Sequence, residues 1–464
     1  MLFSSITFLY AFLPLTLLLY FLSPRAWRNG VLLLASLVFY CFGEPVYVTL
    51  LLISSVSDYF WSLLIEKHRD SPGKMKAFLV SSLVINLGLL GFFKYADFLI
   101  GTVNALLGTA LPLTGVPLPI GISFFTFQTM SYTIDVYRGR AHAQKNFATF
   151  ATFVCLFPQL IAGPIVRYTD VSAELERRKS TLEGMALGMR RFAFGLAKKV
   201  LLANAMGELC AAFRASDDPS VLFYWIYAAA FTFQIYFDFS GYSDMAIGLG
   251  RIFGFHFPEN FDYPYVSRSI SEFWRRWHMT LGGWFRDYVY IPLGGNRTSR
   301  GKWLRNLAVV WLLTGLWHGA SWNFVLWGAM FGVLLIVEKL WLGRLLERWP
   351  RLLQHLYVLL LILVSFVIFN ADGLAGVRAD LAGLFGLAGL PAASAGALYY
   401  LRSYAVLLAV CAAAALPLGK RLYARVEQSK VMTVAEPLAT ALLLTAATAS
   451  LVDGSFNPFL YFRF

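Results

Sequence analysis

Long apolar runs recur along this chain of 464 residues and limit its possible folds more than any other feature. The chain is 58% hydrophobic and 14% charged, whereas about 25% of residues are charged in an ordinary soluble domain. A run of about 20 apolar residues can cross a bilayer as a helix. Because backbone groups in lipid must satisfy one another, such runs predict helices rather than open sheets. The sequence therefore predicts an all-α polytopic membrane protein.

The number and length of the runs predict a large bundle. Some runs are long enough for two crossings, so we expect roughly ten to twelve membrane-embedded helices, including re-entrant and interfacial ones. No internal repeat is visible, and we expect a single integral membrane domain over residues 1–464. The runs lie near residues 5–22, 30–65, 77–107, 119–137, 147–166, 185–213, 220–255, 304–342, 352–371, 404–418 and 435–452.

Basic residues give the chain a net charge of +13 and fall in short clusters between the apolar runs. This distribution is typical of cytoplasmic loops that face anionic lipids, and it argues against nucleic-acid binding. Arg25 and Arg28 are expected to be cytoplasmic, which places the N-terminus outside. The four cysteines are scattered singly, so we expect neither a metal site nor a disulfide framework.

The run at 147–166 contains helix breakers. Pro158, Gly163 and Pro164 interrupt it within FPQLIAGP, and proline removes a backbone donor from a helix interior. Basic residues flank the run on both sides. It is either a re-entrant segment that enters and leaves on one face or a kinked spanning helix.

A first polar motif, YFDFSGYSDMAIGLG, carries two carboxylates in an apolar run. On a helix, Asp238 shares one face with Gln234 and Tyr242, while Ser240 and Asp244 share another. Three interpretations stay open for this motif. It could hold a hydrogen-bond network, it could form an ion site, or its carboxylates could pair with basic residues and lock helices together.

A second motif, SISEFWRRWHMTLGGWFRDYVYIPLGGNR, begins with a helix-start signal. Ser269 and Glu272 have capping-box spacing, and Glu272 to Arg276 is a favourable i,i+4 pair. The spacing of its aromatic and apolar residues predicts one helix with a stripe suited to the membrane interface. His278 lies off that stripe. The stripe consists of Phe273, Trp277, Leu281, Trp284 and Tyr288.

A basic cluster follows the second motif, at Arg297, Arg300, Lys302 and Arg305. It could anchor the chain to lipid headgroups, or it could contact an anionic donor such as a nucleotide-bearing thioester.

A third motif, WLLTGLWHGASWNFVLWG, places His318 in an apolar run between basic ends. About 34 intervening residues would extend about 50 Å as helix, so we expect either a bent hairpin or a long tilted helix with His318 near its middle. A titratable group at such depth is a functional-site hypothesis by default. A neutral imidazole can accept a proton from a hydroxyl, which is general-base chemistry for acyl transfer. The alternative is a histidine with a purely structural role.

The three motifs together resemble the membrane-bound O-acyltransferase family, and within it the bacterial alginate O-acetyltransferase branch. The resemblance extends over essentially the whole chain. It also rests on MLFSSITFLYAFLPL, LPIGISFFTFQTMSYTIDVYRG, LFPQLIAGPIVRY and the ending SFNPFLYFRF.

This resemblance implies a multi-helix fold with a tunnel in which a cytoplasmic thioester, such as acetyl-CoA, meets an acceptor hydroxyl from the far side. It implies no bound cofactor. It also implies a location in a bacterial inner membrane with the N-terminus periplasmic, and periplasmic polysaccharide-acetylation proteins as partners. His318 would be the catalytic base, and His278 or a nearby polar group would orient the reactants or support the oxyanion. Residues expected to position donor or acceptor are Asp238, Ser240, Asp244, Trp317, Asn323, Arg275, Arg276, Asn296 and Arg297.

One position departs from the alginate branch. Phe331 stands where members of that branch carry a further histidine, so the resemblance implies acyl transfer without fixing alginate as the polymer. Acetylated cellulose, another exopolysaccharide and cell-wall glycan stay open. Two other functions are also open: an ion-coupled transporter that uses Asp238 and Asp244, and a non-catalytic scaffold of an export complex.

Overall fold

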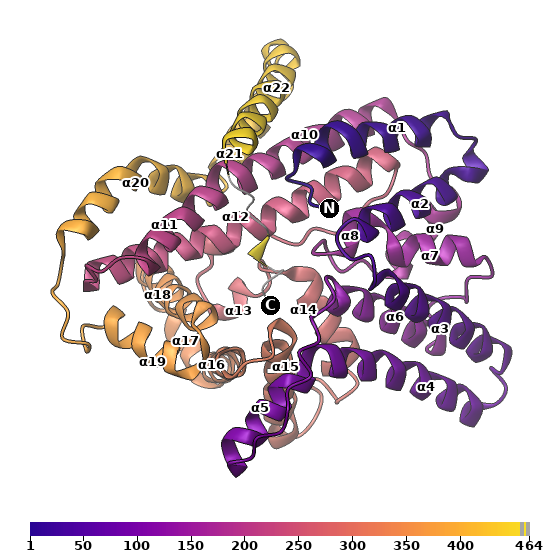
Figure 1. Cartoon of the computed structure of the whole chain (residues 1–464), viewed down its shortest axis with the longest axis horizontal. Helices are drawn as coiled ribbons and strands as arrows, with labels where there is room; N and C mark the ends of the chain where they lie inside the picture. Colours follow the sequence, from indigo (N-terminus) through magenta and orange to yellow (C-terminus); the bar gives the residue numbers. More distant parts are fainter. Residues whose placement is uncertain (455–458, 461–464) are drawn as a thin grey trace. The chain divides into compact units, whose positions relative to one another are not determined.

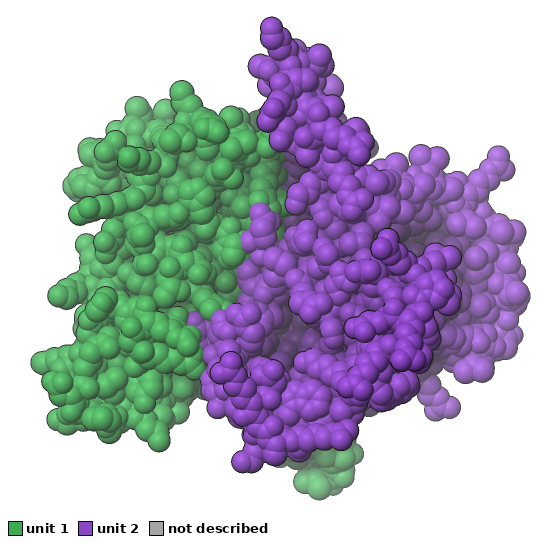
Figure 2. Space-filling model, turned by 180° about the vertical axis from the view of Figure 1, so that it is seen from behind, with its two compact units in different colours: residues 1–192, 242–258 green, residues 193–241, 259–464 purple. Residues whose placement is uncertain are grey.

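A computed structural model of the chain describes residues 1–454 and 459–460. These residues form helices and no strand, which confirms the all-α prediction. They divide into two compact units, of which unit 1 is residues 1–192 with 242–258 and unit 2 is residues 193–241 with 259–464 (Figure 2). Apart from Phe459 and Leu460, the C-terminal motif SFNPFLYFRF lies outside the described residues.

Unit 1 consists mainly of the first nine α-helices. In this unit α3, α4 and α6 pack on one another, and α2 packs against α7 (Figure 1). Their bounds are α1 Leu13–Leu22, α2 Arg28–Cys41, α3 Val48–Lys67, α4 Pro72–Leu90, α5 Ala96–Leu107, α6 Ile122–Tyr137, α7 Phe147–Cys155, α8 Phe157–Leu160 and α9 Tyr168–Glu176.

Unit 2 holds the second and third sequence motifs. In it α15 packs along α16, and α16 also contacts α18 and α19 (Figure 1). Its helices are α11 Asn204–Arg214, α13 Ile270–Phe273, α14 Met279–Phe285, α15 Arg300–His318, α16 Trp322–Val337, α17 Gly343–Leu346, α18 Arg351–Asn370, α19 Gly373–Leu384, α20 Ala395–Ala414, α21 Leu418–Val426 and α22 Lys430–Asp453. Two further helices, α10 Leu182–Ala197 and α12 Val221–Phe253, contribute residues to both units.

Six helical segments in the described part of the chain are long and apolar enough to cross a membrane. This agrees with a multi-pass membrane protein. The expected ten to twelve helices include re-entrant and interfacial ones, which length and hydropathy do not identify, so that number stays a prediction. The segments are Val48–Lys67, Pro72–Leu107, Trp322–Leu346, Arg351–Asn370, Ala395–Ala414 and Lys430–Asp453.

The run at 147–166 is broken, as its prolines and glycine predict. Helix α7 ends at Cys155, the four-residue α8 carries Pro158 in its first turn, and no helix follows before Tyr168. The side chain of Asn146 caps the start of α7 by accepting the N–H of Thr149 at 3.1 Å.

Candidate active site

His318 is the last residue of α15 and stands at the bend of a helical hairpin. The next residue, Gly319, is extended, and α16 begins at Trp322. The hairpin expectation is therefore confirmed, and the long tilted helix is wrong. The bend gives the imidazole a defined position at the tip of two packed helices.

Two glycines bring the arms of this hairpin into backbone contact. A Cβ added at Gly315 would lie 2.3 Å from the carbonyl oxygen of Phe324. One added at Gly328 would lie 2.4 Å from the carbonyl oxygen of Trp311. Both distances are far below van der Waals contact, so only glycine fits this crossing.

Gly328→Ala is expected to destabilise the protein by about 1–3 kcal/mol, the usual cost of overpacking. It should also lower activity, because a displacement of about 1 Å near a reacting centre can cost about a hundredfold in rate. The matched control is Gly301→Ala in the first turn of α15, where an added Cβ meets nothing within 4 Å. Thermal unfolding and acetyl-transfer rates should separate the two variants, and equal behaviour would contradict the packing argument.

Aromatic rings enclose His318, whose exposed fraction is 3%. Its ring centroid lies 5.0 Å from those of Trp317 and Trp327 and 5.3 Å from that of Phe369. The second motif histidine, His278, is the nearest other imidazole in this cluster, at 6.5 Å between ring centroids. The structure thus brings together the two histidines predicted to be catalytic.

His278 interrupts the helix that the apolar stripe predicts. Its backbone is left-handed, with φ 45° and ψ 51°, and it separates α13 from α14. The prediction of one continuous helix is wrong for this reason, although the helix start is confirmed. The Ser269 hydroxyl accepts the N–H of Glu272 at 3.0 Å, and all five stripe residues are buried.

Asn260 fixes the tautomer of His278. The Oδ1 atom of Asn260 accepts the backbone N–H of Thr280 at 3.3 Å and its hydroxyl at 2.9 Å. Because a backbone N–H can only donate, that atom must be the amide oxygen. The Nδ1 atom of His278, 3.1 Å from the same oxygen, therefore carries the hydrogen. In the neutral ring its Nε2 therefore carries no hydrogen and can only accept a hydrogen bond.

Burial lowers the pKa of His278 from 6.5 to about 3. Below about pH 6.5 the unfolded chain binds a proton at this histidine while the folded chain does not. The free energy of unfolding should therefore decrease as the pH is lowered from the upper to the lower of those two pKa values. The expected slope for one proton is at most about 1.4 kcal/mol per pH unit. Unfolding midpoints of the wild type and His278→Gln should converge as pH falls through this window. Parallel curves would contradict the assignment.

The carboxylates of the first motif each pair with a base. Asp238 lies 2.5 Å from the ammonium of Lys199, both side chains being at least 97% buried, and it also accepts the backbone N–H of Leu460 at 2.8 Å. In unit 1, Asp244 lies 2.9 Å from the guanidinium of Arg191. These pairs favour the interpretation in which the carboxylates lock helices together.

Helix α12 carries both carboxylates, and between them it contacts His278. The ring of Phe239 lies edge-on to His278, 4.6 Å between centroids. The adjacent Ser240 is 2% exposed, and its hydroxyl has no hydrogen-bond partner among the described residues. Asp238 is thus one residue from a ring in contact with the site, while its own carboxylate pairs with Lys199.

Asn323 holds in place the segment that carries Phe369, one of the rings around His318. Its Nδ2 donates to the carbonyl of Phe369 at 3.0 Å, and so it ties the start of α16 to the end of α18, where the Phe369 ring faces His318. Four residues later on the same helix face lies Trp327, which the sequence analysis did not single out. Its buried indole N–H finds no acceptor in the described part of the chain. The i,i+4 spacing from Asn323 is the signal that could have identified it.

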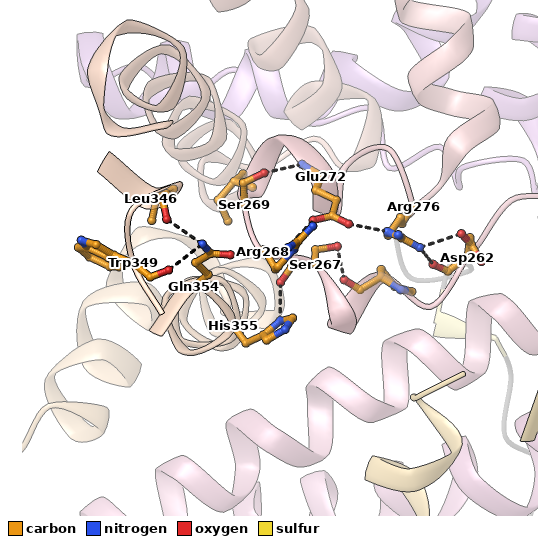
Figure 3. Close-up of polar contacts among 12 residues, drawn as sticks. Asp262, Ser267, Arg268, Ser269, Glu272, Arg276, Leu346, Trp349, Gln354 and His355 are labelled. Carbon is orange, nitrogen blue, oxygen red and sulfur yellow. Dashed lines mark hydrogen bonds and ion pairs between the residues drawn. The ribbon is translucent and has the colours of Figure 1, made fainter. Parts of the chain in front are cut away.

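The basic and amide residues expected to position the donor lie outside the aromatic cluster. Arg275, Asn296 and Arg297 are exposed. Arg276 is held by two carboxylates, Asp262 at 2.8 Å and Glu272 at 3.1 Å (Figure 3). The structure therefore does not bring these four residues together with the histidines.

Comparisons with known proteins show the family to which the chain belongs. The MBOAT, membrane-bound O-acyltransferase family pattern matches residues 119–376, which include both histidines. The probable alginate O-acetylase AlgI of Azotobacter vinelandii is 44% identical over 378 residues, 81% of this chain and 76% of that protein. The peptidoglycan O-acetyltransferase of Helicobacter pylori is 36% identical over 427 residues, 84% of this chain and 81% of that protein. The teichoic acid D-alanyltransferase of Bacillus subtilis is 29% identical over 273 residues, 54% of this chain and 68% of that protein. The chain belongs to the membrane-bound O-acyltransferase family.

Proposed function

We propose that this O-acyltransferase moves an acetyl group from a thioester donor to hydroxyls of an extracytoplasmic polysaccharide, with His318 as the general base. The observation that carries the proposal is the pair of buried imidazoles in one aromatic cluster, 6.5 Å apart between ring centroids. Similarity to an alginate O-acetylase and a peptidoglycan O-acetyltransferase supports the class of acceptor.

The proposed reaction assigns one task to each group. A ring nitrogen of His318 takes the proton of the acceptor hydroxyl as its oxygen attacks the thioester carbonyl. The carbon–sulfur bond then breaks, and the proton returns to the leaving thiolate. The tautomer of His278 favours an orienting role, because an unprotonated Nε2 can accept a hydrogen bond from His318 or from the hydroxyl. The indole N–H of Trp327 is the donor best suited to the developing oxyanion.

The donor and the partners follow from the same reasoning. Acetyl-CoA, or another acetyl thioester, is the proposed donor substrate, and no resident cofactor is needed. Acetyl groups would reach the polymer directly or through periplasmic acetylation proteins. We place the protein in a bacterial inner membrane, among anionic lipids, with a periplasmic N-terminus, because Arg25 and Arg28 follow the first apolar segment.

The rival functions have less support. An ion-coupled transporter would need carboxylates available to an ion, whereas Asp238 and Asp244 are each paired with a base. A scaffold without catalytic activity would give no task to the two buried histidines, of which His278 has a strained left-handed backbone.

The test is acetyl transfer by the purified, reconstituted protein. Radiolabelled acetyl-CoA is supplied with candidate acceptor polysaccharides, with and without periplasmic extract, and label is followed on polymer and on thiol release. We expect donor consumption coupled to O-acetyl ester formation. Ion flux without thioester consumption would favour transport, and neither activity under any condition would favour a scaffold.

A further inference from the structure

A pocket of about 380 Å³ lies on unit 2, and its lining includes none of the aromatic residues around His318. One wall comes from the segments between α12 and α14, with Asp262, Tyr263 and Arg276. The other comes from α21, the short helix between α20 and α22 (Figure 1), with Lys420 and Arg421. The volume falls within the range of small-ligand sites, about 300–1,000 Å³.

The charges of the pocket leave two cations available for a ligand. Arg276 is already neutralised, since its guanidinium contacts Asp262 and Glu272 (Figure 3). Lys420 and Arg421 are exposed, and neither side chain takes part in an ion pair or hydrogen bond among the described residues. With one carboxylate and three basic groups in its lining, the pocket favours an anion.

Backbone strain marks the same place. Among the described residues, Tyr263 and His278 are the two non-glycine residues with positive φ, at 46° and 45°. Such conformations cost about 1–3 kcal/mol and cluster at functional sites. His278 lies in the proposed active site, and Tyr263 lines this pocket, so each strained residue has a site of its own.

The order of the apolar helices places the pocket on the cytoplasmic side. The turn between α16 and α18 carries Arg348, and the stretch between α20 and α22 carries Lys420, Arg421 and Arg425. If α18 and α20 each cross the membrane, both connections lie on one side, and their basic residues make that side cytoplasmic. The imidazole of His355, at the start of α18, lies 3.1 Å from the carbonyl of Ser267 (Figure 3). This contact holds the segment that follows the strained Tyr263 at the start of α18, which is the cytoplasmic end.

We propose that the pocket of Tyr263, Arg276, Lys420 and Arg421 binds a phosphate group at the cytoplasmic membrane surface. Arg421 and Lys420 supply charge-assisted hydrogen bonds to its oxygens. The phosphate belongs either to an anionic lipid headgroup or to a soluble phosphate compound. This site does not depend on the acyl-transfer chemistry proposed for His318.

The test measures thermal unfolding of the full chain in phosphatidylcholine nanodiscs. One arm adds inorganic pyrophosphate, and the other replaces part of the lipid with phosphatidylglycerol. A ligand that binds only the folded chain raises the unfolding midpoint. The variants are Lys420→Gln and Arg421→Gln, and the matched control is Arg425→Gln, which makes the same charge change on the same helix outside the pocket.

We expect at least one probe to raise the midpoint in the wild type and in Arg425→Gln. Each pocket variant should bind that probe about tenfold more weakly, the effect of losing one charge-assisted contact. A shift with pyrophosphate alone assigns a soluble phosphate, and a shift with phosphatidylglycerol alone assigns a lipid. The proposal is overturned if neither probe acts, if Arg421→Gln responds like the wild type, or if Arg425→Gln loses the response equally.

Discussion

His318→Ala is expected to lower the acetyl-transfer rate by about 10²–10⁴-fold, the usual contribution of a general base. The variant removes the imidazole at the bend between α15 and α16, where three aromatic rings surround it. Release of labelled thiol from acetyl-CoA by reconstituted protein measures the effect. The loss should be mainly in kcat if donor binding is unchanged.

Two controls keep this result interpretable. His142→Ala removes an imidazole whose side chain is 91% exposed and which pairs with Glu66, and it should leave the rate near that of the wild type. Unfolding midpoints report whether His318→Ala still folds. A folded His318→Ala protein with unchanged thiol release would rule out the proposed base.

Lys199→Met is expected to destabilise the protein by about 3–5 kcal/mol, because it leaves the buried carboxylate of Asp238 without its cation. The two side chains are 3% and 2% exposed, so water cannot replace the lost partner. The Phe459 ring, 4.8 Å from the Lys199 ammonium, would lose a cation–π contact as well. Denaturant or thermal unfolding in detergent measures the loss.

The double variant Lys199→Met with Asp238→Asn is the matched control. It removes both charges while the asparagine oxygen can still accept the N–H of Leu460. Stability should return most of the way to that of the wild type, since a pair replaced by neutral groups of similar size costs little. A double variant as unstable as the single one would show that the charge of Asp238 is not the cause.

The sequence predicted the parts of the site that depend on local pattern. The apolar run around His318 between basic ends indicated either a hairpin or a long tilted helix, and family resemblance indicated the two histidines of the site. The helix start at Ser269 followed from capping chemistry alone. These features depend on spacings of three and four residues along one segment, and the chain satisfies them locally.

Other features depend on contacts between distant segments. The regular stripe from Phe273 to Tyr288 predicted a continuous helix, but His278 adopts a left-handed backbone and bonds to Asn260, 18 residues earlier. Asn260 lies in an irregular loop with no periodic signal. The bases that pair with Asp238 and Asp244 lie 39 and 53 residues away, at Lys199 and Arg191. Hydropathy cannot choose such partners, because any neighbouring cation would satisfy the pattern.

The glycine crossing of the hairpin has a consequence for how enzymes of this kind diversify. Gly315 and Gly328 let one backbone rest directly on the other, so the location of the His318 imidazole is specified by main chain rather than by side-chain volume. The rings of Trp317, Trp327 and Phe369 surround the imidazole but take no part in the backbone contacts of the crossing. Substitution of these rings would therefore change the surroundings of the His318 imidazole without moving the hairpin bend that holds it. The position of the imidazole and the shape of its surroundings thus depend on different parts of the structure.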